Sequence, residues 1–122
     1  MCIDRDIEDL LNKIKTTNKE SGIIHIFAKG STGSVILIED DPNLLHDLFD
    51  ILDKIAPFDR DYKHHMTWHD DNGASHIRAT LLGQEISIPY EEGRLLKGTW
   101  QNIILINHDT RDREREIIVT IL

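Results

Sequence analysis

An apolar run close to the C-terminal end of the chain limits the choice of fold most. Residues 100–107 read Trp-Gln-Asn-Ile-Ile-Leu-Ile-Asn, with four large aliphatic side chains in succession. This length and composition are typical of a buried β-strand, and a strand that is apolar on both faces must be covered on both faces. In a chain of 122 residues, the run predicts a second layer of structure, a subunit contact, or both.

The other regular elements follow from periodicity and turn residues. An i, i+3, i+4, i+7 apolar stripe predicts an amphipathic helix from about Asp4 to Asn18. Asp40 and Asp41 before Pro42 predict the start of a second helix, which runs to about Ile55. Besides the run at 100–107, strands are predicted at 23–27, 35–39, 76–82, 85–89 and 116–122. About two helices, and about six strands grouped as hairpins, predict an α+β fold around a largely antiparallel, sandwich-like sheet.

Composition excludes several classes of protein. The hydrophobic and charged fractions, 39% and 30%, are those of an ordinary soluble protein, and the length favours a single domain over residues 1–122. A net charge of -8 argues against nucleic acid as the main partner. No apolar run reaches the roughly 18 to 20 residues of a membrane span, and no signal peptide is visible. With Cys2 as the single cysteine, we expect a cytoplasmic protein in a reducing compartment.

The stretch from Tyr62 to His76 is the part richest in groups that support chemistry. It holds four of the seven histidines, together with the adjacent polar residues Asp70, Asp71 and Asn72. If 76–82 is a strand, then His76, Arg78 and Thr80 share one face. Such a polar loop predicts a metal or anion site, although its spacing matches no standard zinc motif. The alternative is a surface loop with ordinary hydrogen bonds.

Three other patterns each allow two interpretations. The turn Gly30-Ser31-Thr32-Gly33-Ser34 could present backbone N–H groups to an anion or be a simple hairpin turn. Glu39 and Asp47 could be functional carboxylates near a buried edge, or be exposed to solvent. The segment 108–113 is predicted as a charged hairpin turn, and its arginines with Arg115 could clamp phosphate or be solvated.

The combination of motifs from about Ser21 onward resembles the YjbQ-like family, also called the secondary thiamine-phosphate synthase family, in its archaeal-type branch. The motifs that carry the resemblance are Glu39 followed by Asp47, Tyr62-x-His64, Trp68 to His76, Ile88-Pro89 followed by Gly93, Gly98-Thr99-Trp100-Gln101, and Asp109 followed by Arg113 and Arg115. The resemblance implies a compact α+β fold with a β-sandwich core, assembled as a homotrimer with polar clefts between subunits.

The resemblance also implies a site and an activity. The implied catalytic residues are His64, His76, Glu39 and Asp47, and the implied substrate-binding residues are Asn72, Trp100 and Gln101. The turn at 30–34 adds Ser31 and Thr32 as candidate substrate-binding residues, because it could present its N–H groups to a phosphate. His64, His76 and Glu39 are the implied ligands of a divalent metal such as zinc or magnesium. The implied reaction is weak thiamine-phosphate synthesis, which joins a pyrimidine diphosphate to a thiazole phosphate and releases pyrophosphate. The alternative is a non-catalytic oligomer that binds a small anionic metabolite or metal.

Two departures from the family pattern are visible. Where the family commonly has His-Thr-Thr-Ala, this chain has Gly30-Ser31-Thr32-Gly33, so one histidine is missing. Family members also usually begin with an additional strand before the first helix, which here starts almost at Met1. An absent edge strand would leave backbone groups unpaired, and a neighbouring subunit or the helix would have to cover them.

Overall fold

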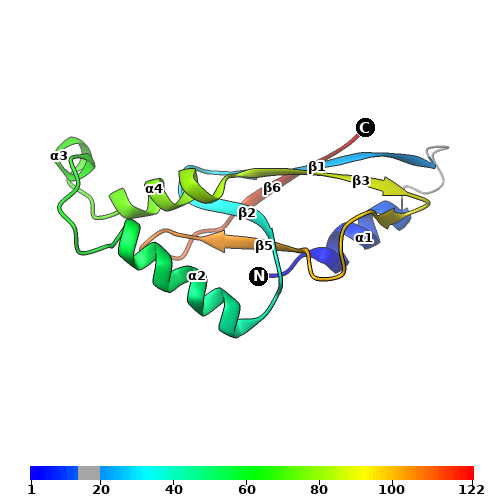
Figure 1. The fold of residues 1–122 in the computed structure, drawn as a ribbon. Coiled ribbons are helices and arrows are strands. Elements are labelled where there is room, and N and C mark those ends of the chain that lie inside the picture. The colour runs from blue at the N-terminus through cyan, green and yellow to red at the C-terminus, as the bar shows by residue number, and fades with distance from the viewer. Residues whose placement is uncertain (14–19) are drawn as a thin grey trace.

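The computed structural model describes residues 1–13 and 20–122, and it shows helices packed against antiparallel strands (Figure 1). The helices are α1 (Asp4–Lys13), α2 (Pro42–Ile55), α3 (His64–Trp68) and α4 (Gly73–Leu82). The strands are β1 (Ser21–Lys29), β2 (Gly33–Ile38), β3 (Glu85–Glu91), β4 (Arg94–Leu95), β5 (Asn102–Asn107) and β6 (Glu116–Ile121). The predicted α+β class with antiparallel strands is confirmed.

The strands form two sheets around one apolar core. The first sheet has the order β4-β3-β1-β6, and the second pairs β2 with β5. Ile24 and Ile26 of β1, which are fully buried, share the core cluster with Ile103 of β5. α1 adds Ile7 and Leu11 to the same cluster, as its amphipathic pattern predicts. Residues 14–18 of the predicted first helix lie outside the described part of the chain.

The apolar run of β5 is covered on both faces within one chain. Ile103 and Ile104, whose side chains point to opposite faces, are 0% and 1% exposed. On the partner strand, Ser34 of β2 donates a hydrogen bond through Oγ to the carbonyl oxygen of Ala79 in α4, at 3.4 Å. The predicted second layer is therefore present, and α4 supplies part of it by packing against β2.

The start of α2 is built as the sequence predicts. Asp41 caps the helix, and its carboxylate accepts hydrogen bonds from the backbone N–H groups of Asn43 and Leu44, at 3.3 and 3.2 Å. Pro42, which has no N–H to leave unpaired, follows at the first helical position. The helix ends at Ile55, directly before the segment that carries the histidines.

The predicted strand at 76–82 is wrong, because these residues belong to α4. The buried residues of α4 are Gly73, Ala74, Ser75, Arg78 and Ala79, a helical spacing. The apolar and polar residues alternate in sequence, but Arg78 is buried at 4% exposure while Ile77 is 45% exposed. A buried arginine therefore concealed the helical period, and His76, Arg78 and Thr80 do not share the face of a strand. α3, within the predicted loop, was also missed.

The predicted grouping of strands into hairpins is largely wrong. β5 and β6 lie in different sheets, so the segment 108–115 crosses between sheets instead of forming a hairpin turn. β1 and β2 also lie in different sheets. Among the described strands, β3 and β4 are the pair that is consecutive in sequence and also hydrogen-bonded. Long-range register places these strands, and turn residues do not encode it. In the part of the chain that the structure describes, no helix is long and apolar enough to span a membrane.

Candidate functional site

The centre of the candidate site is a pair of histidines brought together by two helices. His64 begins α3 and His76 lies in α4, and their ring centroids are 4.6 Å apart with the ring planes inclined at 46°. The two rings are twelve residues apart in sequence, and the turn between the helices folds one back on the other. Both were predicted as catalytic residues and metal ligands, and the structure places them side by side.

Asp70 and Asn72 lie behind His64. Asp70 Oδ1 is 3.2 Å from His64 Nδ1, a separation that makes an ion pair when the imidazole is protonated. It is not a hydrogen bond, since Nδ1 has no hydrogen-bond partner among the described residues. With its amide turned so that both ends are satisfied, Asn72 donates to Asp70 Oδ1 at 2.8 Å. Asn72 therefore holds Asp70 in place next to His64.

The surroundings of His76 disfavour its positive charge. Burial lowers the pKa of His76 below its usual 6.5, and the neighbouring His64 lowers it further, while Asp70 and Asp109 act in the opposite direction. His76 is thus mainly neutral near pH 7 and can accept a proton.

A pocket of about 470 Å³ opens beside the two imidazoles. Arg60 and Lys63 supply two positive charges to its lining against the one carboxylate of Asp61. Ile55 and Ile77 supply apolar surface. Tyr62 also lines the pocket, and its hydroxyl donates a hydrogen bond to the carbonyl oxygen of Pro57 at 2.6 Å. The pocket therefore suits a small anion with an apolar portion. Nothing in the spacing of Arg60 and Lys63 had marked them as site residues.

Gly73, which follows Asn72 and begins α4, lies very close to the side chain of Tyr62. A Cβ atom at Gly73 would lie 2.8 Å from the Cβ of Tyr62, closer than real Cβ contacts. The start of α4 can therefore approach the Tyr62 segment, and with it His64, only without a side chain at this position.

A second polar network lies close to His76 and centres on Asp109, whose side chain is 2% exposed. Asp109 Oδ2 accepts hydrogen bonds from Thr32 Oγ1 at 3.0 Å and from Arg113 Nε at 2.9 Å. Burial alone would raise the pKa of Asp109, but these two hydrogen bonds outweigh it and hold the pKa below its usual value. Arg115 donates to Thr32 Oγ1 at 2.6 Å. Thr32 is thus engaged by protein groups, and Asp109, not predicted as a site residue, anchors the network.

The turn at residues 30–34 is covered by an arginine. A Cβ atom at Gly30, whose φ is +123°, would lie 2.8 Å from Arg115 Nη1, and one at Gly33 would lie 3.2 Å from Arg115 Nε. Glycine at both positions leaves room for the guanidinium to lie against the turn, and the positive φ of Gly30 favours glycine as well. Ser31 is exposed at the tip. The positive charge beside this turn comes from Arg115, for which the sequence allows either a phosphate clamp or a solvated side chain.

The remaining predicted site residues lie at the other end of the β2–β5 pair. The register places Gly33 opposite Asn107, and Ile38 opposite Asn102. Glu39 follows β2 at that far end, seven residues or about 23 Å along the strand from Thr32. Trp100 and Gln101 precede β5 at the same end, where Trp100 is 69% exposed and Gln101 Oε1 accepts a hydrogen bond from the Gly98 N–H at 2.7 Å.

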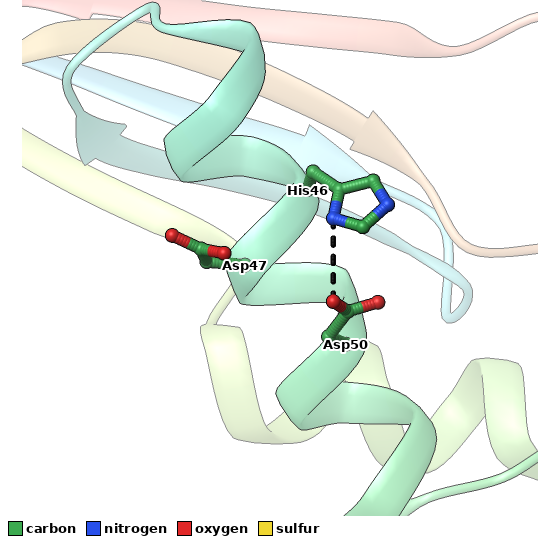
Figure 2. A group of neighbouring side chains, drawn as sticks. All are labelled: His46, Asp47 and Asp50. Atoms are coloured by element: carbon green, nitrogen blue, oxygen red, sulfur yellow. Dashed lines mark ion pairs between the residues drawn. The ribbon is translucent and has the colours of Figure 1, made fainter.

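Asp47 belongs to neither group. Figure 2 shows it on α2 beside His46 and Asp50, with His46 Nδ1 and Asp50 Oδ2 3.2 Å apart. All three residues are exposed, and they form the one group of three His, Cys or carboxylate residues that converge closely enough for a metal within residues 1–13 and 20–122. An exposed i, i+4 pair on a helix is common without a metal, so the position of Asp47 does not by itself indicate a role.

The predicted metal ligands are not assembled within one chain. His64 and His76 can offer two imidazole nitrogens, but Glu39 lies at the opposite end of β2. A zinc site needs at least three protein ligands. Within residues 1–13 and 20–122, the three predicted ligands therefore do not converge on one point.

Comparisons with known proteins agree with this fold over its whole length. The sequence model of the family described as UPF0047 protein YjbQ-like matches residues 1–122. A UPF0047 protein of Archaeoglobus fulgidus is 30% identical over 118 residues, which cover 96% of this chain and 91% of the relative. The UPF0047 protein YjbQ of Escherichia coli O157:H7 is 30% identical over 116 residues, covering 93% of this chain and 83% of the relative.

Solved structures show the same architecture. The crystal structure of a YbjQ-like protein of unknown function from Sulfolobus solfataricus P2 has a TM-score of 0.87 at 33% identity, covering 99% of this chain and 84% of the other. A hypothetical protein from Aeropyrum pernix K1 has a TM-score of 0.89 at 25% identity, covering 100% of this chain and 87% of the other.

Proposed function

The chain belongs to the YjbQ-like (UPF0047) family, and on that premise we propose that it binds a small phosphorylated metabolite at the His64–His76 pair. The observation that carries the proposal is the contact of the two imidazoles, 4.6 Å apart, at a pocket of about 470 Å³. Arg60 and Lys63 in the lining of this pocket would neutralise phosphate charge.

The proposed chemistry is weak thiamine-phosphate synthesis. In this reaction the thiazole nitrogen displaces pyrophosphate from the pyrimidine methylene carbon, and the main demand on the protein is to stabilise the departing negative charge. Arg60 and Lys63 would do this electrostatically. Neutral His76 can accept a hydrogen bond from the substrate, and His64, paired with Asp70 when protonated, can donate one to a phosphate oxygen.

We further propose that a homotrimer completes the site. Glu39, Trp100 and Gln101 lie together at the end of the β2–β5 pair opposite the histidines, so a neighbouring copy could bring them to the pocket. An exposed apolar surface supports such a contact, since Ile55 of α2 and Ile77 of α4 are 55% and 45% exposed and both line the pocket.

The second candidate is a protein that binds the same metabolite without converting it. The separation of Glu39 and Asp47 from the histidines favours it, because two of the four predicted catalytic residues are then absent from the site of a single chain. Binding would still rest on the histidines and the basic residues of the pocket.

The test measures binding and turnover on the same protein. Hydroxymethylpyrimidine diphosphate and thiazole phosphate would be titrated calorimetrically and then assayed together for thiamine phosphate. We expect binding to fall at least tenfold in His64→Ala and His76→Ala but not in His46→Ala, which removes an exposed histidine of α2. Binding with product supports the synthase, and binding without product supports the second candidate. If neither compound binds, or if the His76→Ala variant retains full affinity and turnover, the proposal fails.

A further inference from the structure

Asp70 lies in the turn between α3 and α4, where its carboxylate contacts the ring of His64. Its Oδ1 is 3.2 Å from His64 Nδ1, and the side chains of His64 and Asp70 are 30% and 32% exposed. Nδ1 itself is buried, although the side chain of His64 lines the pocket. The exposed part of the ring is therefore on the side of Nε2.

This contact determines which ring nitrogen carries the hydrogen. An ionised carboxylate only accepts hydrogen bonds, and Asp70 accepts from the side-chain amide of Asn72 at 2.8 and 3.3 Å. If Nδ1 of His64 presented a lone pair, two acceptors would face each other across 3.2 Å at a buried atom. A buried acceptor without a donor costs free energy. Nδ1 should therefore carry the hydrogen and point it at Asp70.

We propose that Asp70 is a positioning residue for His64, an inference that rests on the proposed function. Asp70 keeps the hydrogen on Nδ1 and holds that nitrogen inward, so that Nε2 is the atom that meets the ligand. Nε2 then accepts a hydrogen bond when the ring is neutral and donates one when the ring is protonated. A partner on one ring nitrogen commonly fixes the role of the other in this way. Such contacts are often poorly aligned in a free protein and tighten on binding.

His76 fixes the plane of the His64 ring, and Asp70 selects its orientation within that plane. The two rings pack with their centroids 4.6 Å apart. A half turn of the His64 ring about its own bond would keep this packing, but it would exchange Nδ1 with the carbon Cδ2. The carboxylate of Asp70 would then face a carbon in place of a hydrogen-bond donor. Asp70 therefore favours one of the two ring orientations that fit beside His76.

The neighbouring carboxylates have other places or partners. Asp71, the next residue, accepts a hydrogen bond through Oδ1 from Thr110 Oγ1 at 3.2 Å. Asp61 lines the pocket, but the carboxylate that lies against His64 Nδ1 is that of Asp70. Asp71 is therefore a matched control, since it has the same charge at the adjacent position and a different partner.

The experiment measures the tautomer of His64 directly in the full chain. Protein labelled with ¹⁵N in histidine is studied by two-bond ¹⁵N–¹H NMR correlation at about pH 8.5, where an ordinary imidazole is neutral. The spectrum distinguishes Nδ1–H from Nε2–H, and the signals of His64 are those that disappear in His64→Gln. The variants are Asp70→Ala and the control Asp71→Ala. Calorimetric titration with hydroxymethylpyrimidine diphosphate gives the affinity of each protein.

We expect His64 to carry its hydrogen on Nδ1 in the wild type and in Asp71→Ala, and to lose this preference in Asp70→Ala. Affinity should fall about tenfold in Asp70→Ala and less than about twofold in Asp71→Ala, because partners that orient a histidine have effects of this size. The wild-type spectrum requires no substitution to fold, and a hydrogen mainly on Nε2 of His64 would overturn the proposal. An unchanged tautomer in Asp70→Ala would overturn it as well.

Failure of this inference can be distinguished from failure of the proposed function. If neither hydroxymethylpyrimidine diphosphate nor thiazole phosphate binds to the wild type, the proposed function fails, while the tautomer of the free protein still decides whether Asp70 orients His64. If the diphosphate binds equally well to the wild type and to Asp70→Ala, the positioning role fails and the proposed function stands.

Discussion

The attachment of α4 to α2 through Arg78 allows a quantitative prediction. Arg78 is 4% exposed and makes three contacts at the base of the helix that carries His76. Its Nε donates to the carbonyl oxygen of Ala56 at 2.9 Å, its Nη2 donates to Asp53 Oδ1 at 2.8 Å, and its guanidinium carbon lies 4.1 Å from the ring centroid of Phe58. Replacement by methionine keeps most of the aliphatic volume and removes all three contacts.

The three losses differ in size. Ala56 is fully buried, so its carbonyl would be left without a partner at a cost of about 1–3 kcal/mol. Asp53 is 63% exposed, which limits that ion pair to about 0–1 kcal/mol. The cation–π contact with half-exposed Phe58 adds about 0.5–1 kcal/mol. We expect Arg78→Met to lower the free energy of unfolding by about 1.5–5 kcal/mol, the sum of these losses, and the melting temperature by about 10 °C.

Urea unfolding followed by circular dichroism measures this loss, with Asp53→Asn as the control that removes the ion pair alone. Asp53→Asn should cost less than about 1 kcal/mol. A second readout is independent of stability. Burial, and then the charges of Arg78 and Arg115, hold the pKa of His108 at about 4, so the pKa of His108 should rise in Arg78→Met. A loss below about 1 kcal/mol in Arg78→Met, or an equal loss in Asp53→Asn, would refute this reasoning.

Three further predictions follow from the site and its surroundings. The pKa of His108 falls from 6.5 to about 4 on folding, so between these pH values the unfolded chain binds a proton that the folded chain does not. The stability of the protein should therefore decrease by about 3 kcal/mol as the pH falls from 6.5 to 4. The variant His108→Gln should not show this decrease. In His64→Ala, the pKa of His76 measured by NMR should rise, since a positive neighbour is lost, and an unchanged or lower value would contradict the electrostatic account. Gly73→Ala should push against Tyr62, cost about 1–3 kcal/mol in urea unfolding and weaken ligand binding, and a neutral effect would show that the close approach is not needed.

Local signals in the sequence were enough for several elements. Asp41 before Pro42 marks the start of α2 because capping depends on neighbouring residues. The run at 103–106 identifies β5 as a strand covered on both faces, because a short apolar run rich in β-branched residues is typical of a strand with a layer on each side. The family motifs pointed to the α+β architecture, which the structure confirms.

The predictions are wrong where contacts between residues distant in sequence decide the type of an element or the position of a residue. The sequence pattern predicts a strand in place of α4 because an arginine at position 78 is expected to be exposed. In the structure Ala56 and Asp53 accept hydrogen bonds from Arg78 and allow its burial. The pairing of His64 with His76 could be anticipated from their shared segment. The position of Glu39 at the far end of β2 could not, because it depends on the register of β2 with β5.

Arg115 connects parts of the chain that are distant in sequence. Its guanidinium donates to Thr32 before β2 and to Asn107 at the end of β5, and Thr32 donates to Asp109, whose charge acts on His76. Displacing Arg115 would therefore disturb Thr32 and Asp109 and, through them, the electrostatic surroundings of His76. Any contact that moves Arg115 would be coupled to binding at His76 by the same free energy in both directions.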